Sequence, residues 1–176
     1  GRNLYRFYDE EMGVAGDQLQ EMQLDLKQAL ENYEFELYFQ PKVDAQHGHI
    51  RGLEALIRWR HPVKGSILPT VFIQAAERFG LISRIHHWVV EECCRTMHRL
   101  RSQGLHTQIS VNLAAQQLRD PALVHNIVEL LDQFQLPHSC LVFEISGLMA
   151  LKHPDIFNAR MAEFQSAGID IALDDF

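Results

Sequence analysis

Hydrophobic residues recur along the chain with two periods. After a polar and aromatic opening, apolar residues at helical spacing predict a helix over 17–32. From Phe35 onward, runs with a period of two residues predict strands, and the stretches between them have a helical period. The predicted strands are 35–41, 49–59, 107–113, 140–146 and 169–176, and the predicted helices after residue 35 are 70–80, 83–104, 120–134 and 154–167. Strands that alternate with helices predict an α/β fold with parallel pairing.

Local signals predict where several helices begin and end. Ser83 is expected to cap the long helix that follows it, and Pro121 is expected at the first position of the next helix. Gly80, Gly104 and Gly168 are expected to end helices, because glycine adopts the left-handed conformation that often follows a last helical turn.

Composition narrows the class of protein. The 176 residues suit one domain, and 23 Asp and Glu against 16 Lys and Arg give a net charge of −7. An acidic balance argues against binding to polymeric nucleic acid. No apolar run is long enough to span a bilayer, so no direct membrane insertion is expected. The three cysteines form no metal or disulfide pattern, which favours a cytoplasmic location and leaves open a membrane tether elsewhere in the parent protein.

Polar residues interrupt the predicted strands in a regular way. A period of two places apolar residues on one face of each strand and an oxygen-bearing side chain on the other, near the carboxyl end. These residues are Glu54, Asn112, Glu144 and Asp174, with Asp175 directly after. Each alone has a structural explanation: a helix cap for Asp174 or Asp175, an ion pair with Arg58 for Glu54, and a loop hydrogen bond for Asn112.

Taken together, these residues favour a metal site. Inward-facing polar residues at the carboxyl ends of parallel strands are typical of the active-site end of a barrel. Converging carboxylates repel one another without cations, and an all-oxygen ligand set suits Mg²⁺, Mn²⁺ or Ca²⁺. Two such ions suit phosphoryl chemistry, and Arg58 supplies a donor for a phosphate.

Several separated motifs resemble the EAL domain family of cyclic di-GMP phosphodiesterases and their non-catalytic relatives. The similarity runs from about residue 20 to the end of the chain. Its motifs are Gln40-Pro41, 52–62 (GLEALIRWRHP) with the naming tripeptide Glu54-Ala55-Leu56, 69–82 (PTVFIQAAERFGLI), Trp88-Val89, Val111-Asn112-Leu113 and Asp174-Asp175-Phe176. Residues 1–12 resemble the closing strand of a GGDEF domain. The resemblance implies that 1–16 are the tail of an upstream GGDEF-like domain and its linker, and that 17–176 are the N-terminal part of an EAL domain.

The resemblance also implies an activity and a set of residue roles. It implies a modified TIM-type (β/α) barrel with an N-terminal helix, incomplete here at about five of eight strands, that hydrolyses cyclic di-GMP to linear pGpG. The cofactor would be Mg²⁺ or Mn²⁺, with Ca²⁺ inhibiting turnover or supporting binding only. The implied metal ligands are Glu54, Asn112, Glu144, Asp174 and Asp175, of which Glu54 and Asp175 are also implied to be catalytic, and the implied dinucleotide contacts are Gln40, Leu56 and Arg58.

Three departures from the family pattern bear on activity. Gly147 stands where the family usually has Glu, Ala114 where Ser is common, and the chain stops at Phe176, before the family's catalytic Lys and further ligands. Weak or absent turnover by this fragment is therefore expected. The alternatives are a non-catalytic module that binds cyclic di-GMP and relays its occupancy, and a dimerising scaffold. Because the strand at 169–176 would present an unpaired edge, we expect a homodimer formed by domain exchange or edge pairing.

Overall fold

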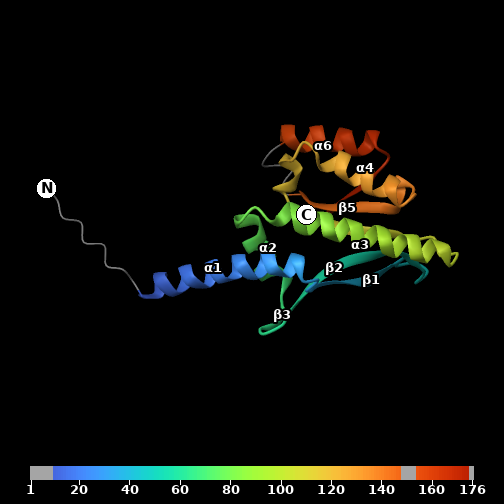
Figure 1. Cartoon of the computed structure of the whole chain (residues 1–176). Coiled ribbons are helices and arrows are strands. Elements are labelled where there is room, and N and C mark those ends of the chain that lie inside the picture. Colours follow the sequence, from blue (N-terminus) through green and yellow to red (C-terminus); the bar gives the residue numbers. More distant parts are fainter. Residues whose placement is uncertain (1–9, 148–153, 175–176) are drawn as a thin grey trace.

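A six-stranded sheet with helices packed on it forms the body of the molecule (Figure 1). The computed structural model describes the backbone of residues 10–147 and 154–174, and the side chains of 20–147 and 154–173. The helices are α1 (Glu10–Glu31), α2 (Pro69–Arg78), α3 (Ile82–Ser102), α4 (Leu123–Gln133) and α6 (Pro154–Ser166), with short 3-10 turns at Gln117–Arg119 and His138–Cys140. The strands are β1 (Phe35–Val43), β2 (Ile50–His61), β3 (Gly65–Ile67), β4 (Gln108–Leu113), β5 (Leu141–Ser146) and β6 (Asp170–Asp174).

The strand order confirms the predicted α/β class. β1 and β2 form an antiparallel hairpin, while β2, β4, β5 and β6 run parallel in the order β1-β2-β4-β5-β6. Each parallel crossover contains a helix, as the alternating pattern predicts. The sheet formed by the described residues is open. The remaining strand, β3, pairs with the end of β2. It was not predicted, because its three residues are too few to show a period of two.

The apolar face of the sheet forms the core with the helices. Trp59 on β2 is fully buried, and its ring lies 5.6 Å from that of Phe72 on α2. Phe35 at the start of β1 packs 5.7 Å from Trp59. Further along the sheet, the rings of Phe143 on β5 and Phe164 on α6 are 5.5 Å apart, and both are fully buried. The core therefore lies on the face that the period-two pattern assigned to the helices.

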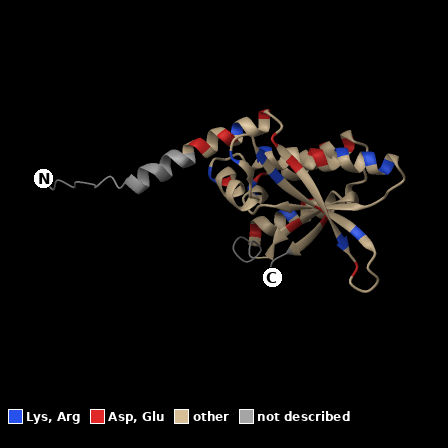
Figure 2. Cartoon of the chain, turned by 90° about the horizontal axis from the view of Figure 1, so that it is seen from below, with Lys and Arg blue, Asp and Glu red and all other residues tan. Residues whose placement is uncertain are grey.

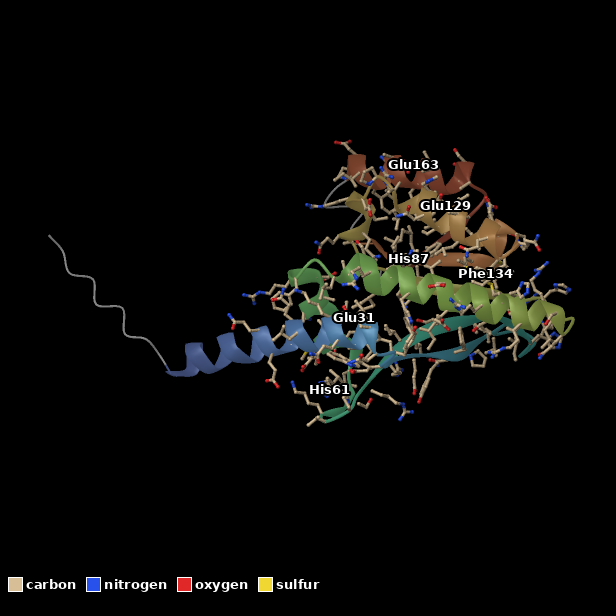
Figure 3. The ribbon with its side chains drawn as sticks, in the orientation of Figure 1. Glu31, His61, His87, Glu129, Phe134 and Glu163 are labelled. Carbon is tan, nitrogen blue, oxygen red and sulfur yellow. The ribbon has the colours of Figure 1, made fainter. Side chains whose placement is uncertain are left out.

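Helix α1 is joined to the β2–β3 hairpin by charged groups. Lys64 Nζ lies 2.6 Å from Asp25 Oδ2 and 2.9 Å from Glu21 Oε1, and His61 Nε2 lies 3.2 Å from Asp25 Oδ2. Figure 3 shows His61 on this hairpin and Glu31 at the end of α1. Acidic and basic residues are interspersed over the described helices and strands (Figure 2).

Two predicted helix starts were wrong. α3 begins at Ile82 with Leu81 as its N-cap, and Ser83 provides no cap; burial of Leu81 and Ile82 in the core sets this start. α4 begins at Leu123 and not at Pro121. The Asp120 carboxylate accepts a hydrogen bond from the Ala122 N–H at 2.9 Å, which holds Pro121 in a turn before the helix.

Helix α1 also differs from its prediction, since it begins at Glu10 and runs through Gly13 and Gly16. Glycine inside a helix costs only about 1 kcal/mol relative to Ala, so these two residues do not end it. The predicted glycine stops are confirmed: Gly80, Gly104 and Gly168 have φ angles of 68°, 80° and 71° and follow the ends of α2, α3 and α6. Residues 1–9 of the expected GGDEF-like tail lie outside the described residues.

Candidate functional site

The strand register brings the predicted site positions to one face of neighbouring strands. Gln40 on β1 pairs with Glu54 on β2, and Asn112 on β4 pairs with Glu144 on β5. The backbone of Asp174 pairs with Ser146, so β6 ends beside β5. The side chain of Asp174 and the whole of Asp175 lie outside the described residues.

Glu54 and Asn112 are in direct contact. The side-chain amide of Asn112 donates a hydrogen bond to Glu54 Oε1 at 2.9 Å, across the β2–β4 boundary. Because Asn112 donates this hydrogen bond through its amide nitrogen, its Oδ1 is not used in the bond. Oδ1 therefore remains as an acceptor oxygen beside the Glu54 carboxylate. Two predicted metal ligands therefore present oxygen atoms together.

Glu144 is the most deeply buried of the carboxylates described on this face, at 6% exposed. Lys42 on β1 forms an ion pair with Glu144 Oε1 and lies 3.3 Å from Ser110 Oγ on β4. A buried carboxylate requires such a partner, because an unpaired charge is costly in a low-dielectric interior. Lys42 was not among the predicted site residues, although a period of two places it on the face of Tyr38 and Gln40.

Arg58 and Leu56 line a cavity of about 310 Å³ between the sheet and helices α2 and α3. The guanidinium of Arg58 donates to the Ile57 carbonyl at 2.8 Å and lies 5.9 Å from the centre of the Tyr38 ring. Among the described residues, Arg58 makes no ion pair with Glu54. The structural explanation considered for Glu54, an ion pair with Arg58, is therefore not what the structure shows.

The loop after Asn112 is held by a buried side chain. Gln117 Oε1 accepts a hydrogen bond from the Ala114 backbone N–H at 2.9 Å, and Gln117 is 3% exposed. His86 on α3 lines the same cavity, and burial, with a smaller effect of neighbouring His87, lowers the pKa of His86 to about 4. The Nε2 atoms of His86 and Gln117 are buried and have no hydrogen-bond partner among the described residues.

The donor chemistry of this face fits hard divalent cations. The described candidate ligands Glu54, Asn112 and Glu144 offer oxygen only, and they come from three successive strands. The described side chains contain no cluster of three or more His, Cys, Asp or Glu residues that could hold a metal ion. The two further predicted ligands, Asp174 and Asp175, are those whose side chains lie outside the description.

Acidic and amide side chains that share one face of neighbouring parallel strands, as Glu54, Asn112 and Glu144 do, are typical of α/β proteins with a polar site on the sheet. The chain belongs to the EAL domain family, whose model matches residues 23–176. This confirms the family resemblance seen in the motifs. No helix among the described residues has the length and apolar character required to cross a membrane.

Curated relatives match the whole of this chain. The bifunctional diguanylate cyclase/cyclic di-GMP phosphodiesterase MucR of Pseudomonas aeruginosa is 38% identical over 178 residues, covering 100% of this chain and 26% of the relative. The oxygen sensor protein DosP of Escherichia coli is 31% identical, covering 100% of this chain and 22% of the relative. The chain thus spans about a quarter of the length of these relatives.

Solved structures share the fold. The PaMucR phosphodiesterase in complex with c-di-GMP superposes with a TM-score of 0.84 at 38% identity, covering 89% of this chain and 64% of that chain. The FimX EAL domain from Pseudomonas aeruginosa bound to c-di-GMP gives a TM-score of 0.79 at 27% identity, covering 88% of this chain and 62% of that chain. EAL domains are TIM-like barrels, so the open sheet described here corresponds to part of a barrel wall.

Proposed function

We propose that this chain contributes the first strands and ligands of a metal-dependent phosphodiesterase site that hydrolyses cyclic di-GMP to linear pGpG. The observation that carries the proposal is the placement of Glu54, Asn112 and Glu144 on one face of three successive parallel strands, with Leu56 and Arg58 next to them. The membership of the EAL family and the c-di-GMP complexes of the relatives support this substrate.

The residues of this chain would have different roles at the site, which follow from their chemistry. Glu54, Asn112 and Glu144 would hold Mg²⁺ or Mn²⁺ together with Asp174 and Asp175. When bound, these ions supply positive charge that stabilises charge developing on the phosphate oxygens. Arg58 would bind a phosphate oxygen, because its planar guanidinium forms strong, directed hydrogen bonds to phosphate. Leu56 and Gln40 would contact the dinucleotide, and Asp175 would orient the attacking water.

The proposal is tested with Glu54→Ala in the full-length protein. We expect this variant to lose pGpG formation with Mg²⁺ or Mn²⁺, measured by chromatography, while its circular dichroism spectrum stays unchanged. Glu129→Ala is the matched control, because Glu129 lies on α4 with its side chain 67% exposed. Product formation by Glu54→Ala at the rate of the control would refute the metal role of Glu54.

A second candidate function is binding without turnover. Gly147 follows β5 directly, where the family usually places a carboxylate, and this favours a receptor that holds cyclic di-GMP and relays its occupancy. Calorimetric titration of the full-length protein with cyclic di-GMP in Ca²⁺ distinguishes the two functions when combined with the product assay. Binding with turnover supports the enzyme, and binding alone supports the receptor.

We also propose that a second copy of the chain pairs along β6. In the described part of the chain, β5 is the one strand that pairs with β6, so the other edge of β6 carries backbone groups able to extend the sheet. Sedimentation velocity of this chain at micromolar concentration is expected to show a dimer. A monomer over that concentration range would refute the edge pairing.

A further inference from the structure

Lys42 lies among the proposed metal ligands although it cannot itself bind a cation. It projects from β1, and its ammonium reaches Ser110 on β4 and Glu144 on β5. The path crosses β2 at Gly52, which pairs with Lys42 and has no side chain on the face that it shares with Glu54. The lysine side chain can therefore extend over β2 to the centre of the polar face.

The contact joins an exposed stem to a buried acid. The Lys42 side chain is 44% exposed, whereas that of Glu144 is 6% exposed. Glu144 therefore needs a cation, while the flexible lysine stem has solvent available to it in another rotamer. The pair is asymmetric: removing Lys42 leaves a buried negative charge, and releasing Lys42 to water leaves a solvated ammonium.

We propose that Lys42 is an internal counter-ion of the metal-free site that competes with a divalent cation for Glu144 and so limits the affinity of the site. The proposal rests on the metal role given to Glu144 in the proposed function. A divalent ion at Glu144 must displace the ammonium or share the carboxylate with it, and two positive charges at one carboxylate repel each other in this partly buried setting. Metal binding would thus release Lys42 toward solvent.

A purely structural role for Lys42 gives a different expectation. If the lysine only tied β1 to β5, its removal would lower the free energy of unfolding and leave metal affinity unchanged. If it held Glu144 in the geometry that the metal requires, its removal would weaken metal binding. Competition alone predicts tighter binding when the ammonium is removed.

The test is Mn²⁺ titration by calorimetry of metal-free, full-length protein without nucleotide at a fixed neutral pH. We expect Lys42→Met to bind Mn²⁺ about tenfold more tightly than the unsubstituted protein, because a nearby like charge has been removed. Lys42→Arg keeps the charge and should bind Mn²⁺ with close to the original affinity. Lys27→Met is the matched control, since it removes one exposed positive charge on α1 and should leave the affinity unchanged.

A second measurement separates stability from affinity. In EDTA, Lys42→Met should unfold at a lower temperature than the unsubstituted protein, because Glu144 has lost its partner. Addition of Mn²⁺ should raise the unfolding temperature of Lys42→Met by a larger amount than it raises that of the unsubstituted protein. If Lys42→Met does not fold in EDTA, Lys42→Gln takes its place in both measurements. Unchanged or weaker Mn²⁺ binding by the neutral variant would overturn the competition.

Glu144→Gln distinguishes a failure of this inference from a failure of the proposed function. Loss of Mn²⁺ binding in Glu144→Gln, with no effect of Lys42→Met, would refute the competition by Lys42 but would still support Glu144 as a metal ligand. Mn²⁺ binding that is unaffected by Glu144→Gln, or absent from the unsubstituted protein, would overturn both the metal role and the inference built on it.

Discussion

Acidification should destabilise the fold through one buried histidine, His86. Its side chain is 7% exposed on the inner side of α3, and its ring lies 5.8 Å from that of Phe143. In the part of the chain that the structure describes, its Nε2 atom has no hydrogen-bond partner that could stabilise a proton. Burial is the main cause that lowers the pKa of His86 from 6.5 to about 4, and His87 adds to it.

The sign and size of the effect follow from these pKa values. Above pH 6.5, His86 is neutral in both states and adds no pH dependence. Between pH 6.5 and about 4, the unfolded chain binds a proton that the folded chain does not, so the free energy of unfolding falls as the pH falls. The full interval corresponds to roughly 3 kcal/mol, at about 1.36 kcal/mol per pH unit.

A second histidine, His138, has a pKa shift of the opposite sign, and it affects stability in a different pH range. Hydrogen bonds to Asp132 and to the Ala167 carbonyl raise the pKa of His138 above 6.5. The stability from protonated His138 is fully present below pH 6.5 and is lost as the pH rises through its raised pKa. It is therefore constant over the interval in which His86 acts.

The measurement is urea unfolding, followed by circular dichroism, of the unsubstituted protein, His86→Leu and His87→Leu between pH 7 and pH 4. On acidification, we expect the free energy of unfolding to fall in the unsubstituted protein and in His86→Leu. The fall should be smaller in His86→Leu than in the unsubstituted protein, by up to roughly 3 kcal/mol. His87→Leu should change the pH profile much less, because His87 is exposed beside a groove between α3 and α4 (Figure 3) and is the smaller cause of the lowered pKa of His86. Parallel pH profiles for all three proteins would refute the reasoning.

Two further substitutions test the packing that supports the site. Gly52→Ala should lower the free energy of unfolding, measured in urea, by about 1–2 kcal/mol. The alanine Cβ would lie 3.1 Å from the Gln108 carbonyl oxygen of the paired strand. An unchanged urea midpoint would show that the two strands move apart without cost. Phe164→Ala should cost about 3–5 kcal/mol, because this ring is fully buried against Phe143, and a loss below 1 kcal/mol would show that the site collapses around the missing ring.

The faces of the strands were predictable from sequence, whereas contacts between distant strands were not. A period of two within each strand assigns Glu54 and Asn112 to the polar face, and parallel pairing then brings them together. The Lys42–Glu144 contact spans 102 positions and crosses two intervening strands, so no local pattern encodes it. Burial also overrode a local signal at α3, where Leu81 sets the start that Ser83 was expected to set.

The two faces of the sheet separate stability from chemistry. Trp59 and Phe143 pack toward the helices and anchor the core, and the polar side chains of the same strands point the other way. On that polar face the two carboxylates whose side chains the structure describes each have a donor within the chain: Asn112 for Glu54 and Lys42 for Glu144. These donors reduce the mutual repulsion of the two acids, and a divalent cation bound at the proposed site would have to displace them or share the carboxylates with them. In the proposed metal site, competition within the sheet would set the metal affinity, while the buried aromatic and aliphatic core lies on the opposite face.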